Sequence, residues 1–301
     1  MDRLDAMTTL LAVVDAGSLS AASRKLGTPL ATVSRRVSEL EAHLNTRLLN
    51  RSSRSLTLTD SGEVYIQACR RILDQLDEAE HIASGEYRAP KGELTVTASM
   101  VLGRRHVVPV AAAFLETHPE VLVRLRLTDR VINLQEEHVD LAIRIGVLPD
   151  SNMIARPIGS VRLVVCASPA YLASRGRPET PRDLAGHDCV SFAGFTHTDT
   201  WRFPIEGTTV PVPVRSRLVA DAAEAVLAAG IAGAGIIRLF SYQIGDAVKA
   251  GALTTLLQGF EPPPLPVSIV YLDGARQPLK TRAFIDFAVP ELKARLAADL
   301  R

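Results

Sequence analysis

The sequence is poor in the residues that build disulfide-stapled, zinc-binding or membrane-spanning proteins. Its three cysteines, Cys69, Cys166 and Cys189, are odd in number and far apart. They form neither a disulfide framework nor a zinc-ligand spacing, and a reducing compartment suits them best. The longest apolar run, residues 225–237, is too short and too rich in glycine to cross a bilayer.

The N-terminus also lacks the pattern of an export signal. Residues 1–5 read Met-Asp-Arg-Leu-Asp, which is acidic where a signal peptide is basic, and no apolar stretch follows. Hydrophobic residues make up 47% of 301 positions, which is enough for about two domains with real cores and excludes a disordered chain. We therefore expect a soluble, intracellular protein.

Patterns of catalytic and metal-binding residues are missing as well. The seven histidines include no close pair and no His-Glu-x-x-His motif, and no Gly-x-Ser-x-Gly elbow occurs. The glycines of residues 230–235 follow a predicted helix and precede a predicted strand, which is the reverse of the order in phosphate-binding loops. The sequence thus predicts no enzyme, no metal and no cofactor.

Charge is balanced overall but not locally. There are 34 basic and 33 acidic residues, giving a formal charge of +1. Residues 24–54 hold seven basic and two acidic residues, a local charge of +5, whereas residues 61–90 hold three basic and six acidic residues, a local charge of −3. An isolated basic run is usually a solvated face, so the pattern beneath it decides its meaning.

That basic run falls on a predicted set of three short helices. The first helix ends at Gly17, the second spans residues 21–26 with Ser20 as its cap and Gly27 at its end, and Thr28-Pro29 begins the third. The apolar residues of the third helix share one face: Val33, Val37, Leu40 and Leu44. The short connection between the second and third helices is typical of a helix-turn-helix motif.

The outer face of the third helix is polar and basic, as a DNA-reading helix requires. Ser34 and Arg35 lie in its N-terminal half, which enters the major groove in this motif. Arginine can hold guanine O6 and N7 together or bridge to a phosphate. The segment 51–59 alternates polar and β-forming residues, which predicts a hairpin wing. The predicted DNA-binding residues are Pro29, Thr32, Ser34, Arg35, Arg36, Arg51 and Arg54. A three-helix domain with merely solvated arginines is the alternative.

These motifs resemble the N-terminus of LysR-type transcriptional regulators. The resemblance rests on the segments 17–22 (Gly-Ser-Leu-Ser-Ala-Ala), 33–35 (Val-Ser-Arg), 40–41 (Leu-Glu), 48–51 (Leu-Leu-Asn-Arg) and 58–62 (Leu-Thr-Asp-Ser-Gly). Two positions depart from the common pattern: Leu30 stands where many members carry a base-reading glutamine, and Asn50 replaces a frequent phenylalanine. The first departure questions direct readout by position 30.

A long amphipathic helix is predicted from its Thr59 cap to about residue 87. Its heptad seam consists of Tyr65, Cys69, Ile72, Leu76, Ala79 and Ala83. Because a lone helix of this length is marginal, we expect a second chain to cover the seam, as similar regulators dimerise through this helix. Packing against its own domain is the alternative, and Cys69 is expected to be a small core residue. Residues 84–92 have the breakers of a hinge.

From residue 93 onward, strand-like and helix-like segments alternate, which predicts parallel sheets covered by helices on both faces. Predicted strands lie at 94–98, 121–127, 140–145, 161–167, 236–239 and 267–272. Predicted helices lie at 104–116, 131–137, 169–174 and 221–232, the last capped by an Asp221 box, and from 279 onward, with a kink or restart at Pro290.

This region resembles the effector-binding domain of the same family, which has a two-lobe, periplasmic-binding-protein-like α/β fold. The resemblance implies an all-α, winged helix-turn-helix domain over 1–60, a linker and dimerisation helix over 61–90, and an effector-binding domain over 91–301. Within the last domain, lobe I would comprise 91–161 and 265–301, and lobe II 162–264.

Ligands of open parallel sheets bind at the carboxyl ends of the strands. That rule points to Ser99 and Met100, Thr128 and Arg144, which follow or end three predicted strands. Phe192 and Phe195 are expected to line the opposite wall. A hydroxyl, amides and one arginine suit a small carboxylate. Each residue also has an ordinary structural role open to it: a cap, a turn, an internal ion pair or a core aromatic.

The resulting prediction is a ligand-responsive transcription factor, either an activator or a repressor, that works in the cytoplasm. Its expected partners are double-stranded DNA with an interrupted palindromic operator, further copies of itself in a homodimer or homotetramer, a small organic anion, and RNA polymerase. A solute-binding protein or an enzyme on the same bilobal fold is the rival interpretation. The former would lack residues 1–90, and the latter would need a catalytic cluster.

Overall fold

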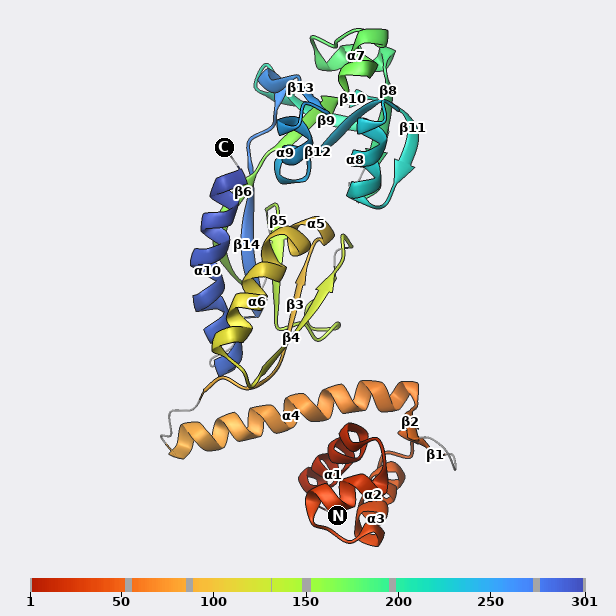
Figure 1. Ribbon diagram of the computed structural model, residues 1–301, viewed down its shortest axis with the longest axis vertical. Helices are drawn as coiled ribbons and strands as arrows, with labels where there is room; N and C mark the ends of the chain where they lie inside the picture. Colours follow the sequence, from red (N-terminus) through yellow and green to blue (C-terminus); the bar gives the residue numbers. More distant parts are fainter. Residues whose placement is uncertain are drawn as a thin grey trace. The chain divides into compact units, whose positions relative to one another are not determined.

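A computed structural model describes residues 2–51, 56–84, 89–130, 132–147, 153–194, 199–272 and 277–299. The chain forms two compact units, Met1–Arg88 and Ala89–Arg301 (Figure 1).

The N-terminal unit is a winged helix-turn-helix followed by a long helix. Its elements in chain order are α1 (Arg3–Ala16), α2 (Leu19–Leu26), α3 (Leu30–His43), β1 (Leu49–Arg51), β2 (Leu56–Leu58) and α4 (Asp60–Ser84). β1 and β2 pair antiparallel, with Asn50 opposite Thr57, which confirms the predicted hairpin. The predicted face of α3 is buried, since Val33, Val37 and Leu40 are 0% exposed.

The predicted C-terminal caps of α1 and α2 are confirmed, whereas the predicted N-terminal caps of α2 and α3 are wrong. Gly17 and Gly27 end α1 and α2 with φ of 70° and 60°, a conformation that glycine adopts without strain. The cap of α2 is Ser18, whose hydroxyl accepts from the Ala21 N–H at 3.1 Å, so the prediction of Ser20 was wrong. At α3 the cap position is Pro29, which makes no side-chain cap bond, rather than Thr28.

The C-terminal unit contains two five-stranded sheets. The first sheet has the order β4-β3-β5-β14-β6, built from β3 (Gly92–Ala98), β4 (Val121–Leu127), β5 (Leu141–Ile145), β6 (Met153–Val161) and β14 (Leu265–Leu272). The second sheet has the order β11-β8-β12-β7-β13, built from β7 (Leu163–Ala167), β8 (Asp188–Phe192), β11 (Arg215–Ala220), β12 (Ile236–Phe240) and β13 (Thr254–Leu256). We call the parts built on these sheets lobe I and lobe II.

Helices cover both lobes, and a small hairpin adds to lobe II. The hairpin is β9 (Thr200–Ile205) with β10 (Thr208–Pro213). The helices are α5 (Met100–Leu102), the π-helix η1 (Gly103–Val107), α6 (Val108–Thr117), α7 (Pro169–Arg175), the 3-10 helix η2 (Pro181–Gly186), α8 (Ala223–Ile231), α9 (Ser241–Lys249), the 3-10 helix η3 (Gln258–Phe260) and α10 (Leu279–Asp299). In Figure 1, α6 and α10 lie beside the first sheet.

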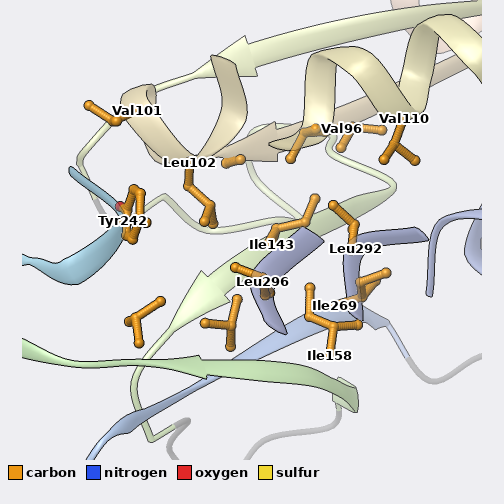
Figure 2. Close-up of a cluster of buried hydrophobic side chains, with 14 of the residues drawn as sticks. Val96, Val101, Leu102, Val110, Ile143, Ile158, Tyr242, Ile269, Leu292 and Leu296 are labelled. Atoms are coloured by element: carbon orange, nitrogen blue, oxygen red, sulfur yellow. The ribbon is translucent and has the colours of Figure 1, made fainter. Parts of the chain in front are cut away.

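The core of lobe I lies between its sheet and its helices. Figure 2 shows strand residues Val96, Ile143, Ile158 and Ile269 gathered with Val110 of α6 and with Leu292 and Leu296 of α10. The same apolar cluster continues into lobe II through buried Tyr242 and reaches Val190 and Phe192. One hydrophobic core therefore spans both lobes, and lobe II has a second core of its own, which includes Trp201, Phe203 and Leu256.

The sheets are mixed rather than purely parallel, which corrects the prediction. β14 runs antiparallel to both β5 and β6, and β12 runs antiparallel to β7. Six strands of this unit were not predicted: β6, β8, β9, β10, β11 and β13. The sequence of β6, Met-Ile-Ala-Arg-Pro-Ile-Gly-Ser-Val, lacks a continuous apolar run.

The helix predicted at 131–137 is also wrong. Val131 lies outside the described residues, and residues 134–138 form turns. The Asn133 side chain accepts from the Gln135 N–H at 3.0 Å and its carbonyl accepts from the Glu137 N–H at 3.0 Å, as at the start of a helix, but the segment closes only this one turn. His138 follows with a φ of 54°, which is left-handed.

Three further helices differ from the predictions in their detail. The helix predicted from Arg104 begins at Met100 and widens into η1, where a Cβ on Gly103 would lie 2.2 Å from the Leu127 side chain. The α8 helix begins at Ala223 without a side-chain cap, so Asp221 does not cap it. The α10 helix continues through Pro290 without restarting.

A test of helix length and hydropathy finds no single membrane-spanning candidate among the described residues. Within the described part of the chain, one bent pair, α1 with α2 at 118°, has the length and composition of a span.

Candidate nucleic-acid interface and effector site

The exposed face of α3 presents Arg35 at the surface of the N-terminal unit. Its side chain is 67% exposed and lies 3.2 Å from Glu39, one turn further along the helix. Such an exposed pair contributes little to stability, so the guanidinium can exchange Glu39 for another acceptor at small cost. Thr32 and Ser34 are half-buried, and Pro29 is exposed.

Arg36 differs from Arg35 because it is engaged inside the unit. Its guanidinium lies 3.1 Å from the Asp5 carboxylate and donates to the Thr9 hydroxyl at 3.4 Å. These contacts join α3 to α1 and hold the orientation of the helix. Of the two neighbouring arginines, Arg35 is therefore the better placed to contact bases.

The wing is attached to α3 by the Glu41 carboxylate, a role that the sequence analysis did not assign. Glu41 Oε1 accepts from the backbone N–H groups of Leu48 and Leu49, at 2.8 and 3.0 Å. Both leucines are buried, at 1% and 3% exposure. The signal in the sequence was the acid itself, near the end of a helix and just before a strand. Arg54 lies outside the described residues, as does the side chain of Arg51 at the end of β1.

The first turns of α4 pack against the unit's own core. Thr59 caps the helix as predicted, accepting from the Gly62 N–H at 2.9 Å. Cys69 is fully buried, and burial raises the pKa of its thiol. Burial, followed by the neighbouring Cys69, raises the pKa of Tyr65 to about 12. Both side chains are therefore neutral at pH 7 and serve as packing groups.

Further along α4 the seam faces outward. Ile72 is 42% exposed and Leu76 is half-buried. The side chains of Ala79 and Ala83 lie outside the described part. The predicted contact with a second chain therefore stays a prediction, and Ile72 and Leu76 are the described residues that can test it.

In lobe I, three parallel strands bring the predicted effector residues together. Ala98 of β3 lies opposite Leu127 of β4 and Ile143 of β5. The next residues along each strand are Ser99, Thr128 and Arg144, so all three lie in one row at the carboxyl edge of the sheet. This arrangement follows the general rule for open α/β sheets.

Asp129 changes the chemistry of this edge and was not among the predicted residues. Its Oδ1 accepts from the Met100 N–H at 3.1 Å, which occupies the first amide of α5. Burial raises the pKa of Asp129, as does nearby Glu224, although the Met100 bond opposes them. An acid directly after a strand was the only signal, and its partner lies 29 positions away.

The remaining members of the row have different surroundings. The Ser99 hydroxyl is buried beside the Tyr242 hydroxyl of α9, and burial raises the pKa of that tyrosine. The Thr128 hydroxyl accepts from the Arg130 N–H at 3.2 Å, as a turn residue does. Phe192 is buried in the shared core, and Phe195 lies outside the described residues.

Arg144 is a half-buried cation without an acidic partner among the described residues. Its Nη2 donates to the Ile132 carbonyl at 3.1 Å, and burial lowers its pKa. A guanidinium can donate five hydrogen bonds in a fork that matches a carboxylate. Arg144 is thus the group at this edge that is best suited to an anion.

Ion pairs connect the two lobes near this edge. Arg104 of lobe I lies 2.5 Å from Glu224 of lobe II. Arg105 donates to both carboxylate oxygens of Asp246 in α9, at 2.6 and 3.2 Å, and also to Asp299 in α10 at 3.2 Å. A movement of one lobe against the other must break or rearrange these pairs.

Metal and phosphate binding are two further chemistries that clustered side chains and glycine loops can support. Among the described residues, no group of three or more His, Cys, Asp or Glu side chains is arranged to hold a metal ion. Of the glycines at 230–235, Gly230 lies in the last turn of α8, and the others lie between α8 and β12, in the helix-then-strand order that the sequence indicated. A Cβ on Gly235 would lie 2.5 Å from the Asp188 carbonyl oxygen, so close packing accounts for that glycine.

Family models match the chain in two places. One described as a bacterial regulatory helix-turn-helix protein of the lysR family matches residues 4–63. Another, the LysR substrate binding domain, matches residues 88–293.

Similar proteins match nearly the whole chain. An HTH-type transcriptional repressor of Pseudomonas aeruginosa is 35% identical over 291 residues, which are 96% of this chain and 92% of the relative. The structure of CrgA, a LysR-type transcriptional regulator from Neisseria meningitidis, is 33% identical with a TM-score of 0.61 and covers 96% of this chain and 98% of that chain. The full-length Vibrio cholerae virulence activator AphB is 31% identical with a TM-score of 0.61, covering 95% and 98%.

Proposed function

The chain belongs to the LysR family of DNA-binding transcriptional regulators, and from this premise we propose which of its residues bind DNA, effector and partner chain. We propose that residues 1–60 bind DNA, residues 61–90 link and dimerise, and residues 91–301 bind the effector without transforming it. Because its operator lies on the chromosome, the protein works in the cytoplasm.

The observation that carries the DNA-binding proposal is the exposure of Arg35 on a helix whose other arginine, Arg36, is engaged with α1. In a dimer, each of the two recognition helices places its Arg35 against a base edge in one half-site of the operator. The two half-sites form an interrupted palindrome and lie one helical turn of DNA, or a multiple of it, apart. Ser34, Thr32 and Pro29 line the same groove, and Arg51 and Arg54 of the wing hold the backbone or a narrow minor groove.

The test is fluorescence anisotropy with a selected operator and with random DNA of the same length. Arg35→Ala is expected to lose about 1–3 kcal/mol of discrimination per half-site while its circular dichroism is unchanged. Arg130→Ala removes the same charge from an exposed position of the C-terminal unit and serves as the control. An undiminished preference of Arg35→Ala for the operator contradicts the assignment.

For the effector we propose a small organic anion whose carboxylate is held by Arg144, with the hydroxyls of Ser99 and Thr128 beside it. Support comes from the row at the sheet edge and from the half-buried guanidinium. The opposing charge is Asp129, which already occupies the Met100 N–H, so the anion is bound by Arg144 rather than by the start of α5. We include Met100, the buried Phe192 and Phe195 among the residues proposed to contact the effector.

Calorimetry over a panel of small carboxylates tests this site on the full chain. Removing the guanidinium in Arg144→Ala, or the hydroxyl in Ser99→Ala, is expected to weaken binding by about 1–3 kcal/mol. Equal affinity of both variants and the wild type for a confirmed effector places the site elsewhere.

The assembly proposed is a homotetramer built as a dimer of dimers, with α4 as the dimerisation helix. Its exposed Ile72 supports this, together with Leu76 one turn later. Movement of the lobes on effector binding changes the bend of the DNA and the access of RNA polymerase, so the same architecture serves activation or repression.

A further inference from the structure

One large apolar side chain of α3 is not used by the domain core. Leu30, the first residue of α3, is 46% exposed. The other large apolar residues of this helix, Val33, Val37 and Leu40, are each 0% exposed. Leu30 also lies outside the apolar cluster that the described residues of this unit form.

The backbone around Leu30 is fixed. The Pro29 carbonyl accepts from the N–H groups of Thr32 and Val33 at 2.9 and 3.1 Å, which closes the first turn of α3. Side chains of a helix lean toward its N-terminus, so Leu30 projects from the end of α3 that enters the major groove in a helix-turn-helix.

The charge around Leu30 suits DNA better than an apolar protein surface. The first turn of α3 has no acidic residue, and residues 24–54 carry a local charge of +5. Phosphates therefore attract this surface, while the side chain of Leu30 gains free energy when it is buried against an apolar group. In the major groove that group is the 5-methyl of thymine.

We propose that Leu30 reads thymine, by packing against its 5-methyl group in each half-site of the operator. This rests on the proposed DNA-binding function and adds an apolar contact to the polar readout by Arg35. Base preference at this position of the half-site then comes from burial of a methyl group rather than from hydrogen bonds.

Uracil-substituted DNA tests the proposal, because deoxyuridine differs from thymidine only by that methyl group. Thymines of a selected operator are replaced one position at a time, in both half-sites, and affinity is measured by anisotropy. Loss of one buried methyl group raises the dissociation constant roughly fourfold per half-site. Because both half-sites are substituted, the wild type is expected to bind about 15-fold more weakly when uracil replaces the thymine that Leu30 contacts. Leu30→Ala is expected to bind thymine and uracil operators equally at that position.

Two variants connect the effect to the side chain of Leu30. Leu30→Met keeps an apolar side chain of similar volume and should retain the preference for thymine. Val64→Ala shortens another exposed apolar side chain of this unit, 65% exposed on α4, and should leave the preference unchanged. Because Leu30 is outside the core and alanine favours helices, Leu30→Ala is expected to fold.

The outcomes separate this proposal from the one on which it rests. A wild type that prefers its operator but tolerates uracil at every position overturns the role of Leu30 and leaves DNA-binding intact. The same uracil sensitivity in Leu30→Ala as in wild type also overturns it. A wild type with no preference for any selected DNA contradicts the proposed function itself.

Discussion

Replacing Glu41 should loosen the wing without disturbing the C-terminal unit. In Glu41→Ala the buried N–H groups of Leu48 and Leu49 lose a charged acceptor that each now reaches within 3.0 Å. A hydrogen bond to a charged group contributes about 1.5–3 kcal/mol, and an unsatisfied buried donor costs about 1–3 kcal/mol. Since water reaches part of this site, we expect a loss of about 2–4 kcal/mol of unfolding free energy for two bonds.

The chain supplies its own internal reference for this measurement. Its one tryptophan, Trp201, is 2% exposed and lies in lobe II, so its fluorescence follows the C-terminal unit. Far-UV circular dichroism also follows the helices of the N-terminal unit. In urea, with m of about 1–3 kcal/mol/M, the dichroism transition of the N-terminal unit should move down by roughly 0.7–4 M in Glu41→Ala. The fluorescence transition should stay in place.

The neutral variant Glu41→Gln keeps an acceptor oxygen and is expected to lose about half as much, because charge-assisted bonds are roughly twice as strong as neutral ones. A dichroism midpoint unchanged in Glu41→Ala refutes the reasoning, since it means that the carboxylate does not hold the wing. Equal movement of both transitions refutes the assignment of the effect to one unit.

Gly62→Ala should destabilise the N-terminal unit by about 1–3 kcal/mol in the same assay, because the new Cβ would lie 2.1 Å from a backbone oxygen. Gly245→Ala in α9, where a Cβ meets nothing within 4 Å, should instead add about 0.5–1 kcal/mol to the other unit. Leu76→Asp should halve the sedimenting mass in analytical ultracentrifugation if α4 dimerises, and an unchanged mass would place the interface elsewhere. Arg105 lowers the pKa of Asp246, so their bond stabilises the fold above the ordinary carboxyl pKa and is lost as pH falls through the lowered one. Below about pH 4, wild type should therefore lose its advantage over Asp246→Asn, measured by thermal unfolding.

Local signals located the elements of the N-terminal unit and most of lobe I, but they left six of the described strands unpredicted, five of them in lobe II. Gly17 and Gly27 end helices where the sequence predicted, since a left-handed residue needs only its own backbone freedom. The row of Ser99, Thr128 and Arg144 was also predictable, because parallel strands end at a common edge.

Features that depend on contacts across the chain were not predictable in the same way. The bond from Met100 to Asp129 joins residues that follow two different strands, and the sequence pattern shows the acid but not its partner, 29 positions away. Asp221 failed as a cap because the helix starts two residues later, at Ala223. At residues 131–137 an apolar spacing favoured a helix, but the described part of the segment closes only one turn before His138 adopts a left-handed φ.

The route of the chain between the lobes has a consequence for synthesis on the ribosome. All five strands of the lobe II sheet come from residues 163–256, whereas β14 of lobe I, which pairs with both β5 and β6, follows at Leu265–Leu272. During synthesis from the N-terminus, residues 163–256 can therefore complete the lobe II sheet before β14 has been made. At that stage β5 and β6 of lobe I still lack the strand that pairs with both of them. We expect the nascent chain to fold lobe II first, and lobe I to complete only when β14 and α10 have left the exit tunnel. A force-profile measurement on arrested chains would then show release for lobe II at shorter lengths than for lobe I.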